Sequence, residues 1–527
     1  MFRFLVFKDG VPAASWPLRN AYMIGSDGNA VRCELSFKSG SVICRKRESG
    51  SAALALQYPV GDLGELTIQT CLLPERDEPY LLSLELARHQ LMTLYSKMED
   101  WALFDLEQEH PVPRRMERGR SLFIEALSIQ GEDPARAECQ ATECLSVILD
   151  GCEELALAHS ELLLNRRKRS AALPSRSIGC GVGLRQVHDR VRSALTKNFD
   201  FVQLPMPWKH LAPAEGEYNW SVTDDWAQWA TQNKVPVVAG PIISFDPRNL
   251  PDWLYIWEHD YDTVRDLIYE HVERVVNRYK MHFYAWNVIS GLHVNQYFAF
   301  NFEQLMDLTR MTTMLAKKIA PSAQAIIELQ HPFGEYYAHN QRSIPPLMYA
   351  DLVAQSGIGF DLFGIRLAMG QAKPGQYTRD LMQMSNLLDQ FQPFNKPLHL
   401  TVAAPSGPVT GAMIDVPASS EPFDDNSGYW RQPWSELVQS HWLEAALQIS
   451  ISKPMVDAVA WQDLADCTEM DLPLSGLVSE QMKSKGAMRR LSSFRQKLHQ
   501  DGDVDGDPVV SIAVPGTAEA DLTGAGD

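Results

Sequence analysis

Short apolar runs alternate with amphipathic helical segments over most of the chain after residue 177. The eight runs are rich in β-branched and aromatic residues and cover residues 178–182, 199–204, 235–240, 283–289, 325–329, 360–367, 397–402 and 457–461. Segments with helical periodicity accompany them at residues 187–197, 223–233, 261–279, 302–319, 346–356, 377–390 and 434–449. This alternation predicts a (β/α)8 TIM barrel of the α/β class over residues 173–499. A doubly wound open sheet is the alternative, and its glycine-rich fingerprint turn is missing.

The fourth predicted strand runs out into a polar segment, in the stretch MHFYAWNVISGLHVNQY at residues 281–297. The apolar run suits a strand that is covered on both faces. Asn287, Ser290, His293, Asn295 and Gln296 follow at its end. Because such a barrel carries its chemistry at the C-terminal ends of its strands, we expect these residues to line a pocket. An ordinary connection between strand and helix is the alternative.

Residues 1–78 are predicted to form a small β-sandwich. Short β-prone runs such as FRFLVF and AALALQY are separated by turn signals such as KDG at 8–10 and SDG at 26–28. A carbohydrate-binding module is one functional interpretation. A structural domain that packs on the next element is the other, and the sequence favours it slightly.

Residues 79–172 are predicted to form a helical hairpin. Apolar residues recur at spacings of three and four from Leu81 to Met98, and a second helical pattern covers 135–169. The loop is placed around the HPVP segment at 110–113. The basic residues at 166–169 suit either a phosphate site or, more commonly, a helix end before an exposed linker. Residues 500–527 form an acidic Gly/Asp/Ala tail that is predicted to be disordered.

Charge and cysteine usage limit the partners. The chain has 48 Lys and Arg against 66 Asp and Glu, a formal net charge of −18, which argues against nucleic acid and anionic membranes. Its N-terminus, MFRFLVFKDG, is interpreted as a first strand because Arg3 and Lys8 interrupt a very short apolar run. None of the eight cysteines forms a CxxC pair, which predicts free thiols in the cytoplasm. We expect no membrane span, no metal and no cofactor, since zinc-ligand spacings and nucleotide loops are missing.

Several segments of the predicted barrel, taken in order, match a known pattern. They are IGCGV at 178–182, NFDFV at 198–202 followed by Trp208, LPDWL at 250–254, WNVI at 286–289, FDLFG at 360–364, PLHLT at 397–401, and Trp461. In this order and spacing they resemble glycoside hydrolase family 10, the xylanase family. The resemblance implies the barrel, a pocket at its C-terminal face, and hydrolysis of O-glycosidic bonds in a β-linked polysaccharide or oligosaccharide.

The family's catalytic carboxyls do not carry over. A retaining glycosidase needs two carboxyl groups about 5–5.5 Å apart, one as nucleophile and one as acid/base. The family's acid/base Glu follows W-D-V-V-N, where this chain has Gly291, and its nucleophile follows H-I-T, where this chain has Val402. The family segment E-N-x-M-K-W is replaced by QLPMPW at 203–208. The resemblance therefore implies the position of a pocket but not the xylanase mechanism.

Other carboxyls in the predicted loops are candidates for a relocated acid/base pair. Glu328 ends the fifth predicted strand, Glu335 lies in the loop after it, and Asp463 follows the eighth strand. The commoner role for each is a loop acid that caps a helix or pairs with an arginine. Arg366, on the sixth strand, needs a partner if it points inward, and Glu328 on the adjacent strand is expected to provide it. That pair would be structural, or would bind an anionic sugar.

The residues predicted to contact substrate come from seven positions in the barrel. They are Gln203, Trp208, Asn287, His293, Arg366, His399 and Trp461. The ring faces of the two tryptophans suit stacking on sugars, whereas convergence of His293, His331 and His399 on a metal is a minor alternative.

Two main functional hypotheses follow. The leading one is a protein of this family type that binds a carbohydrate, and hydrolyses it with relocated carboxyls. The alternative is a catalytically inactive barrel, a pseudoenzyme, that serves as a carbohydrate-binding or scaffold protein. An enzyme of unrelated chemistry is a third, because fold does not fix function. The sequence leaves the oligomeric state open.

Overall fold

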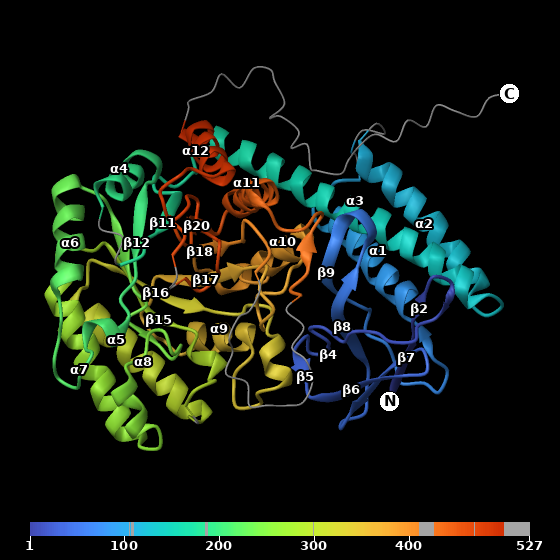
Figure 1. Cartoon of the computed structure of the whole chain (residues 1–527), viewed down its shortest axis with the longest axis horizontal. Helices are drawn as coiled ribbons and strands as arrows, with labels where there is room; N and C mark the ends of the chain where they lie inside the picture. The colour runs from blue at the N-terminus through green and yellow to red at the C-terminus, as the bar shows by residue number, and fades with distance from the viewer. Residues whose placement is uncertain are drawn as a thin grey trace.

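The computed structural model describes residues 1–104, 106, 110–184, 188–298, 300–409, 426–467 and 470–499. The acidic tail predicted at 500–527 lies outside these residues. The molecule has three parts: a β-rich N-terminal region, a layer of long helices, and a barrel (Figure 1). No helix of the described residues is both long and apolar enough to cross a membrane.

The barrel is a closed sheet of eight parallel strands. They are β11 (Ile178–Gly181), β12 (Phe201–Leu204), β13 (Val237–Ala239), β15 (Ala285–Ser290), β16 (Gln324–Leu329), β17 (Leu362–Ala368), β18 (Leu398–Ala403) and β20 (Val456–Trp461). Each strand pairs with the next, and β20 pairs with β11, so the sheet has no free edge. The short β14 (Ile243–Ser244) adds to β15 beside β13. The predicted (β/α)8 barrel is confirmed.

Alternation along the strands divides the barrel's apolar residues into an inner and an outer set. The inner set is small and fills the barrel: Phe201, Val238, Ala285, Ile326, Leu362, Ala458 and Ala460. The outer set packs under a ring of helices: α4 (Asp189–Asn198), α6 (Ser221–Asn233), α7 (Tyr261–Tyr279), α8 (Phe302–Ile319), α9 (Pro346–Gln355), α10 (Leu381–Asp389), α11 (Glu436–Ser452) and α12 (Gly486–His499). Helix α8 shows why these segments are helical, because Asn301 and Gln304 form a capping box before its apolar stripe.

Two sheets make up the N-terminal region. One has the order β10-β1-β7-β6, and its strands are β1 (Phe2–Leu5), β6 (Cys33–Lys38), β7 (Ser41–Lys46) and β10 (Tyr80–Leu81). The other has the order β19-β9-β8-β4-β5, with β4 (Tyr22–Gly25), β5 (Ala30–Val31), β8 (Ala52–Pro59), β9 (Gly64–Gln69) and β19 (Tyr429–Trp430). A hairpin of β2 (Phe7–Lys8) and β3 (Val11–Pro12) accompanies them.

Strand β19 belongs to the barrel's part of the chain, between β18 and α11, yet it completes the second N-terminal sheet. Trp430 pairs with Gly64 of β9. Gly64 has a φ of +103°, and a Cβ there would lie 2.1 Å from the carbonyl oxygen of Tyr429. The close approach of β19 therefore depends on glycine at this position. The N-terminal region and the barrel share one sheet.

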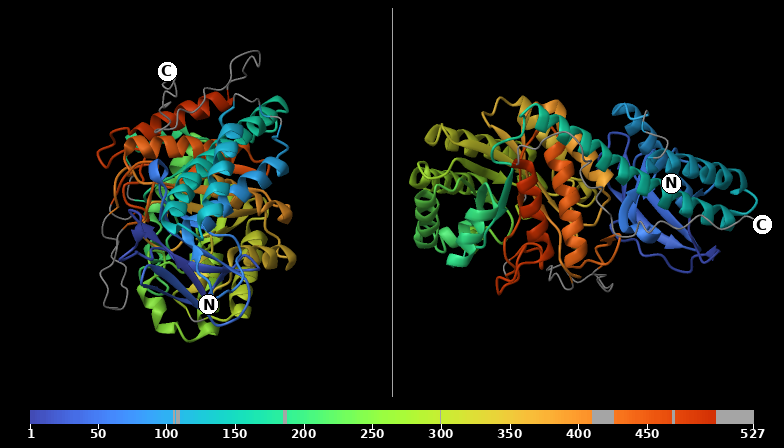
Figure 2. Two further views of the ribbon diagram at one scale, coloured as in Figure 1. Left: turned by 90° about the vertical axis from the view of Figure 1, so that its right-hand side faces the viewer. Right: turned by 90° about the horizontal axis from the view of Figure 1, so that it is seen from above.

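Three helices, not two, connect the N-terminal sheets to the barrel: α1 (Leu82–Asp100), α2 (Pro111–Ile129) and α3 (Pro134–Arg169). The predicted hairpin loop at 110–113 is wrong because this segment begins α2. Pro111 suits the first helical turn, where no amide hydrogen is needed, and the His110 ring accepts a hydrogen bond from the Val112 amide at 3.3 Å. Helix α3 runs from beside the sheets to the barrel (Figure 2) and packs on α10 and α11.

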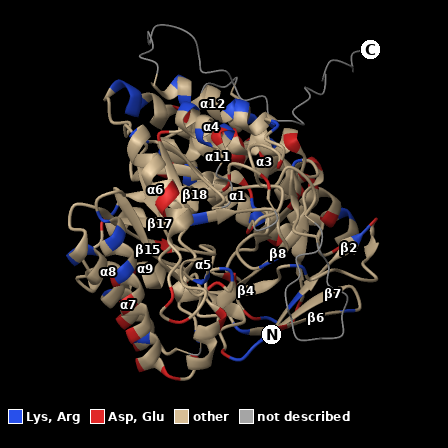
Figure 3. Cartoon of the chain, turned by 60° about the vertical axis from the view of Figure 1, so that its left-hand side comes forward, with Lys and Arg blue, Asp and Glu red and all other residues tan. Residues whose placement is uncertain are grey.

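The basic end of α3 is partly buried against the barrel. Arg167 donates to the carbonyl oxygens of Ile451 at 2.6 Å, Lys453 at 2.8 Å and Val456 at 3.2 Å. These carbonyls lie at the end of α11 and the start of β20, so Arg167 fastens α3 to the base of the barrel. The expected basic helix end before an exposed linker is present, since residues 171, 172, 175 and 176 are exposed, but Arg167 itself is buried. Charges of both signs are spread over the molecule in Figure 3, as on α7.

Candidate functional site

An ion pair between two adjacent strands lies at the C-terminal ends of the barrel strands, a region called the mouth below. Glu328 of β16 is buried, and its Oε1 accepts hydrogen bonds from Ser290 Oγ at 2.5 Å and Arg366 Nε at 3.2 Å. Gln330 Nε2 donates in turn to Ser290 Oγ at 2.8 Å. The predicted pair of Glu328 and Arg366 is confirmed. It places a carboxyl group and a guanidinium side by side inside the mouth.

A second carboxyl, Asp463, lies just beyond β20. Its Oδ2 accepts hydrogen bonds from Gln462 Nε2 at 3.1 Å and Ser475 Oγ at 3.4 Å. Burial raises the pKa of Asp463 to about 6, and the nearby charge of Arg366 opposes that rise. The pKa of Asp463 therefore lies in the range in which a side chain can act as a general acid near neutral pH.

A network of ions links three loops at the rim of the mouth. Asp471 lies 2.7 Å from both Arg248 Nη1 and Lys373 Nζ, and Arg248 also pairs with Asp246 at 2.5 Å. Burial would raise the pKa of Asp471, but the cations Arg248, Lys373 and Arg366 outweigh it and hold that pKa well below its usual value. Asp471 is thus a fixed anion that joins the loops after β14, β17 and β20. The sequence did not lead us to predict this cluster. The charged residues that follow the predicted strands at short distance are the pattern that could have indicated it.

The inner wall of the mouth carries an amide, a hydroxyl and an imidazole. Gln203 Nε2 donates to Thr401 Oγ1 at 3.0 Å and lies 2.9 Å from His399 Nε2. Burial lowers the pKa of His399 to about 4, so the ring is neutral and accepts from Gln203. Asn287 is also buried here, and its Oδ1 has no hydrogen-bond partner among the described residues. These groups are the size and polarity that hydrogen bonding to sugar hydroxyls requires.

The two tryptophans predicted to stack on sugar are covered by protein. Trp208, in the short helix α5 (Trp208–Leu211), is 3% exposed and stacks on His271 with ring centroids 4.3 Å apart. Trp461 is 1% exposed, and its Nε1 donates to the Ser475 carbonyl at 2.7 Å. Neither ring presents a face to the mouth. The prediction that these two rings stack on sugar is therefore wrong, because the surrounding loops and helices cover both of them.

Glu335 and His293, also predicted as site residues, lie elsewhere. Glu335 accepts from the Gly375 amide at 2.9 Å and pairs with Arg379 at 3.5 Å, and Arg379 donates to Tyr22 Oη at 3.0 Å. This places Glu335 in the contact between barrel and N-terminal sheet. His293 is fully buried beside Tyr349, with ring centroids 5.1 Å apart, and its Nε2 lies 3.0 Å from the Gln330 carbonyl oxygen.

Gly291 and Val402, the two positions that the sequence resemblance matches to catalytic carboxyls, carry no ionisable group. Gly291 has a φ of +71°, and a Cβ at this residue would lie 2.8 Å from Gln330 Cδ. Val402 is fully buried in the core between strands and helices. Within the described residues, no group of three or more His, Cys, Asp or Glu has a geometry that could hold a metal ion.

A match to a family model covers the first half of the barrel. Residues 170–307 match the family model "Glycosyl hydrolase family 10". An endo-1,4-beta-xylanase/feruloyl esterase from Xylanibacter ruminicola is 26% identical over 121 residues, which make up 22% of this chain and 16% of that protein. The chain thus spans less than a fifth of this relative.

Solved structures were also compared. A GH10 structure from Paenibacillus barcinonensis has 16% identity and a TM-score of 0.45, covering 62% of this chain and 96% of the other. Native xylanase 10B from Thermotoga maritima has 12% identity and a TM-score of 0.46, covering 63% and 98%. The matched residues 170–307 include the strands from β11 to β15, and these strands carry the similarity to glycosyl hydrolase family 10.

Proposed function

We propose that the chain binds a β-linked saccharide at the mouth and does not hydrolyse it by the family's two-carboxylate route. The observation that carries this proposal is the state of the carboxyls. Gly291 and Val402 occupy the family's catalytic positions, and Glu328 is engaged by Arg366 and Ser290. A retaining glycosidase needs a free carboxylate as nucleophile beside a carboxylic acid.

The remaining polar groups support binding. Gln203, Asn287 and Arg366 lie on three parallel strands of the barrel, β12, β15 and β17, and in this proposal they exchange hydrogen bonds with water for hydrogen bonds with a ligand. The ion pair keeps its charges balanced, so a neutral saccharide meets no unpaired charge. The sequence similarity of residues 170–307 to glycosyl hydrolase family 10 makes a saccharide the favoured ligand class.

Hydrolysis through relocated carboxyls is the second candidate, and one observation favours it. The pKa of Asp463 is raised to about 6, as a general acid for glycoside cleavage requires. Glu328 would then be the ionised partner, released from Arg366 when substrate binds.

Calorimetric titration of the full chain with xylo-, gluco- and manno-oligosaccharides tests the proposal. We expect saturable binding that weakens about 2- to 10-fold in Gln203→Ala, the loss of one or two neutral hydrogen bonds. Gln355→Ala, which alters an exposed glutamine on α9, is the matched control and should bind like the wild type. Absence of binding across the panel would refute a saccharide site.

Parallel assays with aryl β-glycosides separate the two candidates. The binding proposal expects no turnover by the wild type. Turnover that disappears in Asp463→Asn while oligosaccharide binding persists would establish the hydrolytic candidate and reject the non-hydrolytic form.

A further inference from the structure

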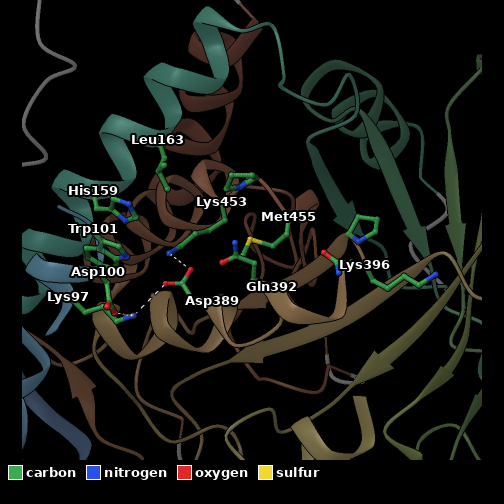
Figure 4. A pocket seen from close by; sticks show the side chains of 13 residues that line it. Lys97, Asp100, Trp101, His159, Leu163, Asp389, Gln392, Lys396, Lys453 and Met455 are labelled. Carbon is green, nitrogen blue, oxygen red and sulfur yellow. Dashed lines mark hydrogen bonds and ion pairs between the residues drawn. The ribbon is translucent and has the colours of Figure 1, made fainter. Parts of the chain in front are cut away.

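A cavity of about 880 Å³ lies at the base of the barrel, at the end opposite the mouth. Its walls come from the end of α1, the middle of α3, the segment between α10 and β18, and the loop between α11 and β20. The lining residues are Lys97, Asp100, Trp101, His159, Leu163, Asp389, Gln392, Asn395, Lys396, Pro397, Lys453, Pro454 and Met455 (Figure 4). Its volume lies in the range of about 300–1,000 Å³ that is usual for small-molecule sites. It exists only because the N-terminal helices pack on the barrel.

We propose that this basal cavity binds a small organic anion that carries a carboxylate or phosphate group. Its polar side chains include two lysines, Lys97 and Lys453, that are shared between two carboxylates, Asp100 and Asp389. Lys453 is almost fully buried, and its Nζ lies 2.6 Å from Asp389 Oδ1, which leaves two of its three N–H groups for another acceptor. Lys97 lies 3.6 Å from Asp100 and 3.8 Å from Asp389, so both of its ion pairs are longer than hydrogen bonds.

An aromatic pair holds these lysines in place. The rings of Trp101 and His159 stack with centroids 3.9 Å apart. The ammonium groups of Lys97 and Lys453 lie over the Trp101 ring, 5.4 and 5.3 Å from its centroid. This cation–π contact, together with the ion pairs to Asp100 and Asp389, fixes both ammonium groups beside the cavity.

The charges around His159 are nearly balanced. Burial first, and then the charges of Lys453, Arg166 and Lys97, lower the pKa of His159 to about 3. The imidazole is therefore neutral and able to donate one hydrogen bond to a ligand. These three cations stand against two carboxylates, Asp100 and Asp389, so one negative charge from a ligand would complete the balance.

The rest of the cavity suits the organic part of such a ligand. Leu163, Pro397, Pro454 and Met455 supply apolar contacts, and Gln392 supplies an amide. A bare inorganic ion would leave this surface unused. Because a ligand here would touch both the N-terminal helices and the barrel, its binding should stabilise the two parts together.

Thermal unfolding and calorimetry of the full chain with citrate, glucose 6-phosphate and inorganic phosphate test the proposal. We expect saturable binding of citrate or glucose 6-phosphate and a rise in melting temperature. Lys97→Gln should weaken binding about tenfold or more, as expected for one charge-assisted hydrogen bond. His159→Phe, which keeps the stack on Trp101, should weaken it less.

Lys318→Gln is the matched control, because it removes the same charge from an exposed residue of α8 that is not part of the cavity lining. Equal weakening in Lys97→Gln and Lys318→Gln would indicate unspecific charge attraction and overturn the proposal, as would absence of saturable binding. Inorganic phosphate that binds as tightly as glucose 6-phosphate would also overturn it, because the organic part of the ligand would then contribute nothing. None of these outcomes depends on saccharide binding at the mouth.

Discussion

Replacing Arg366 by methionine tests whether the mouth depends on its ion pair. The side chain of Glu328 is 2% exposed and that of Arg366 is 22% exposed, so the variant strands a carboxylate that water cannot reach. Only Ser290 Oγ would remain as a donor to it. Breaking a buried pair by removing one partner costs about 3–5 kcal/mol in the free energy of unfolding. For a chain of 527 residues that corresponds to a fall of about 3–5 °C in melting temperature.

Differential scanning calorimetry is the assay. The double variant Arg366→Met/Glu328→Leu should recover most of the lost stability, since apolar residues of similar volume replace buried ion pairs at little cost. A melting temperature that stays within about 1 °C of the wild type in Arg366→Met would refute the reasoning, because surface ion pairs contribute that little.

Three further outcomes are expected. The pKa of Asp463 is raised above its unfolded value, so the folded state binds the proton more tightly and the free energy of unfolding falls as pH rises from 3.8 through about 6. In Asp463→Asn this fall should be smaller by at most about 3 kcal/mol, as measured by urea unfolding at pH 4 and pH 7. Gly291→Glu should produce no hydrolysis of aryl xylosides and should lower stability by about 1–2 kcal/mol, since a side chain there meets Gln330 in a left-handed backbone conformation. Trp208→Phe should leave oligosaccharide affinity within about twofold of the wild type by calorimetry, because its ring is covered by His271.

The sequence predicted the barrel because each strand is a short apolar run that stands alone between helical segments. The run at 360–367, for example, corresponds to β17, and 397–402 corresponds to β18. Helix α2 was missed because Pro111 and Pro113 lie in its first turn, and proline inside a pattern usually indicates a loop. Strand β19 was beyond reach of the sequence, since two residues have no periodicity and their partner is more than 360 positions away.

The same contrast holds in the mouth. Glu328 and Arg366 were predicted to pair because their strands are neighbours and a buried charge needs a partner. The ions of Arg248, Lys373 and Asp471 were missed because they lie in loops, whose conformation no local pattern determines. The prediction that Trp208 stacks on sugar failed for a different reason. A residue that matches a motif in the sequence can still be covered by neighbouring side chains in the fold.

The loops at the barrel's C-terminal face contact the N-terminal region, and these contacts explain why carboxyl groups in the loops have structural roles. The 3₁₀ helix η4 (Glu335–Ala338), after β16, packs on β4 and β5. Arg379, after β17, reaches Tyr22 of the N-terminal sheet.

After β18, the connection contributes β19, and Arg431 next to it pairs with the buried Glu153 of α3 at 2.7 Å. Three successive loops of the face that builds active sites in such barrels thus hold the chain's own N-terminal region. These contacts oppose the loop movement by which many enzymes exclude water and complete a catalytic site, and they are therefore in line with the proposed binding role.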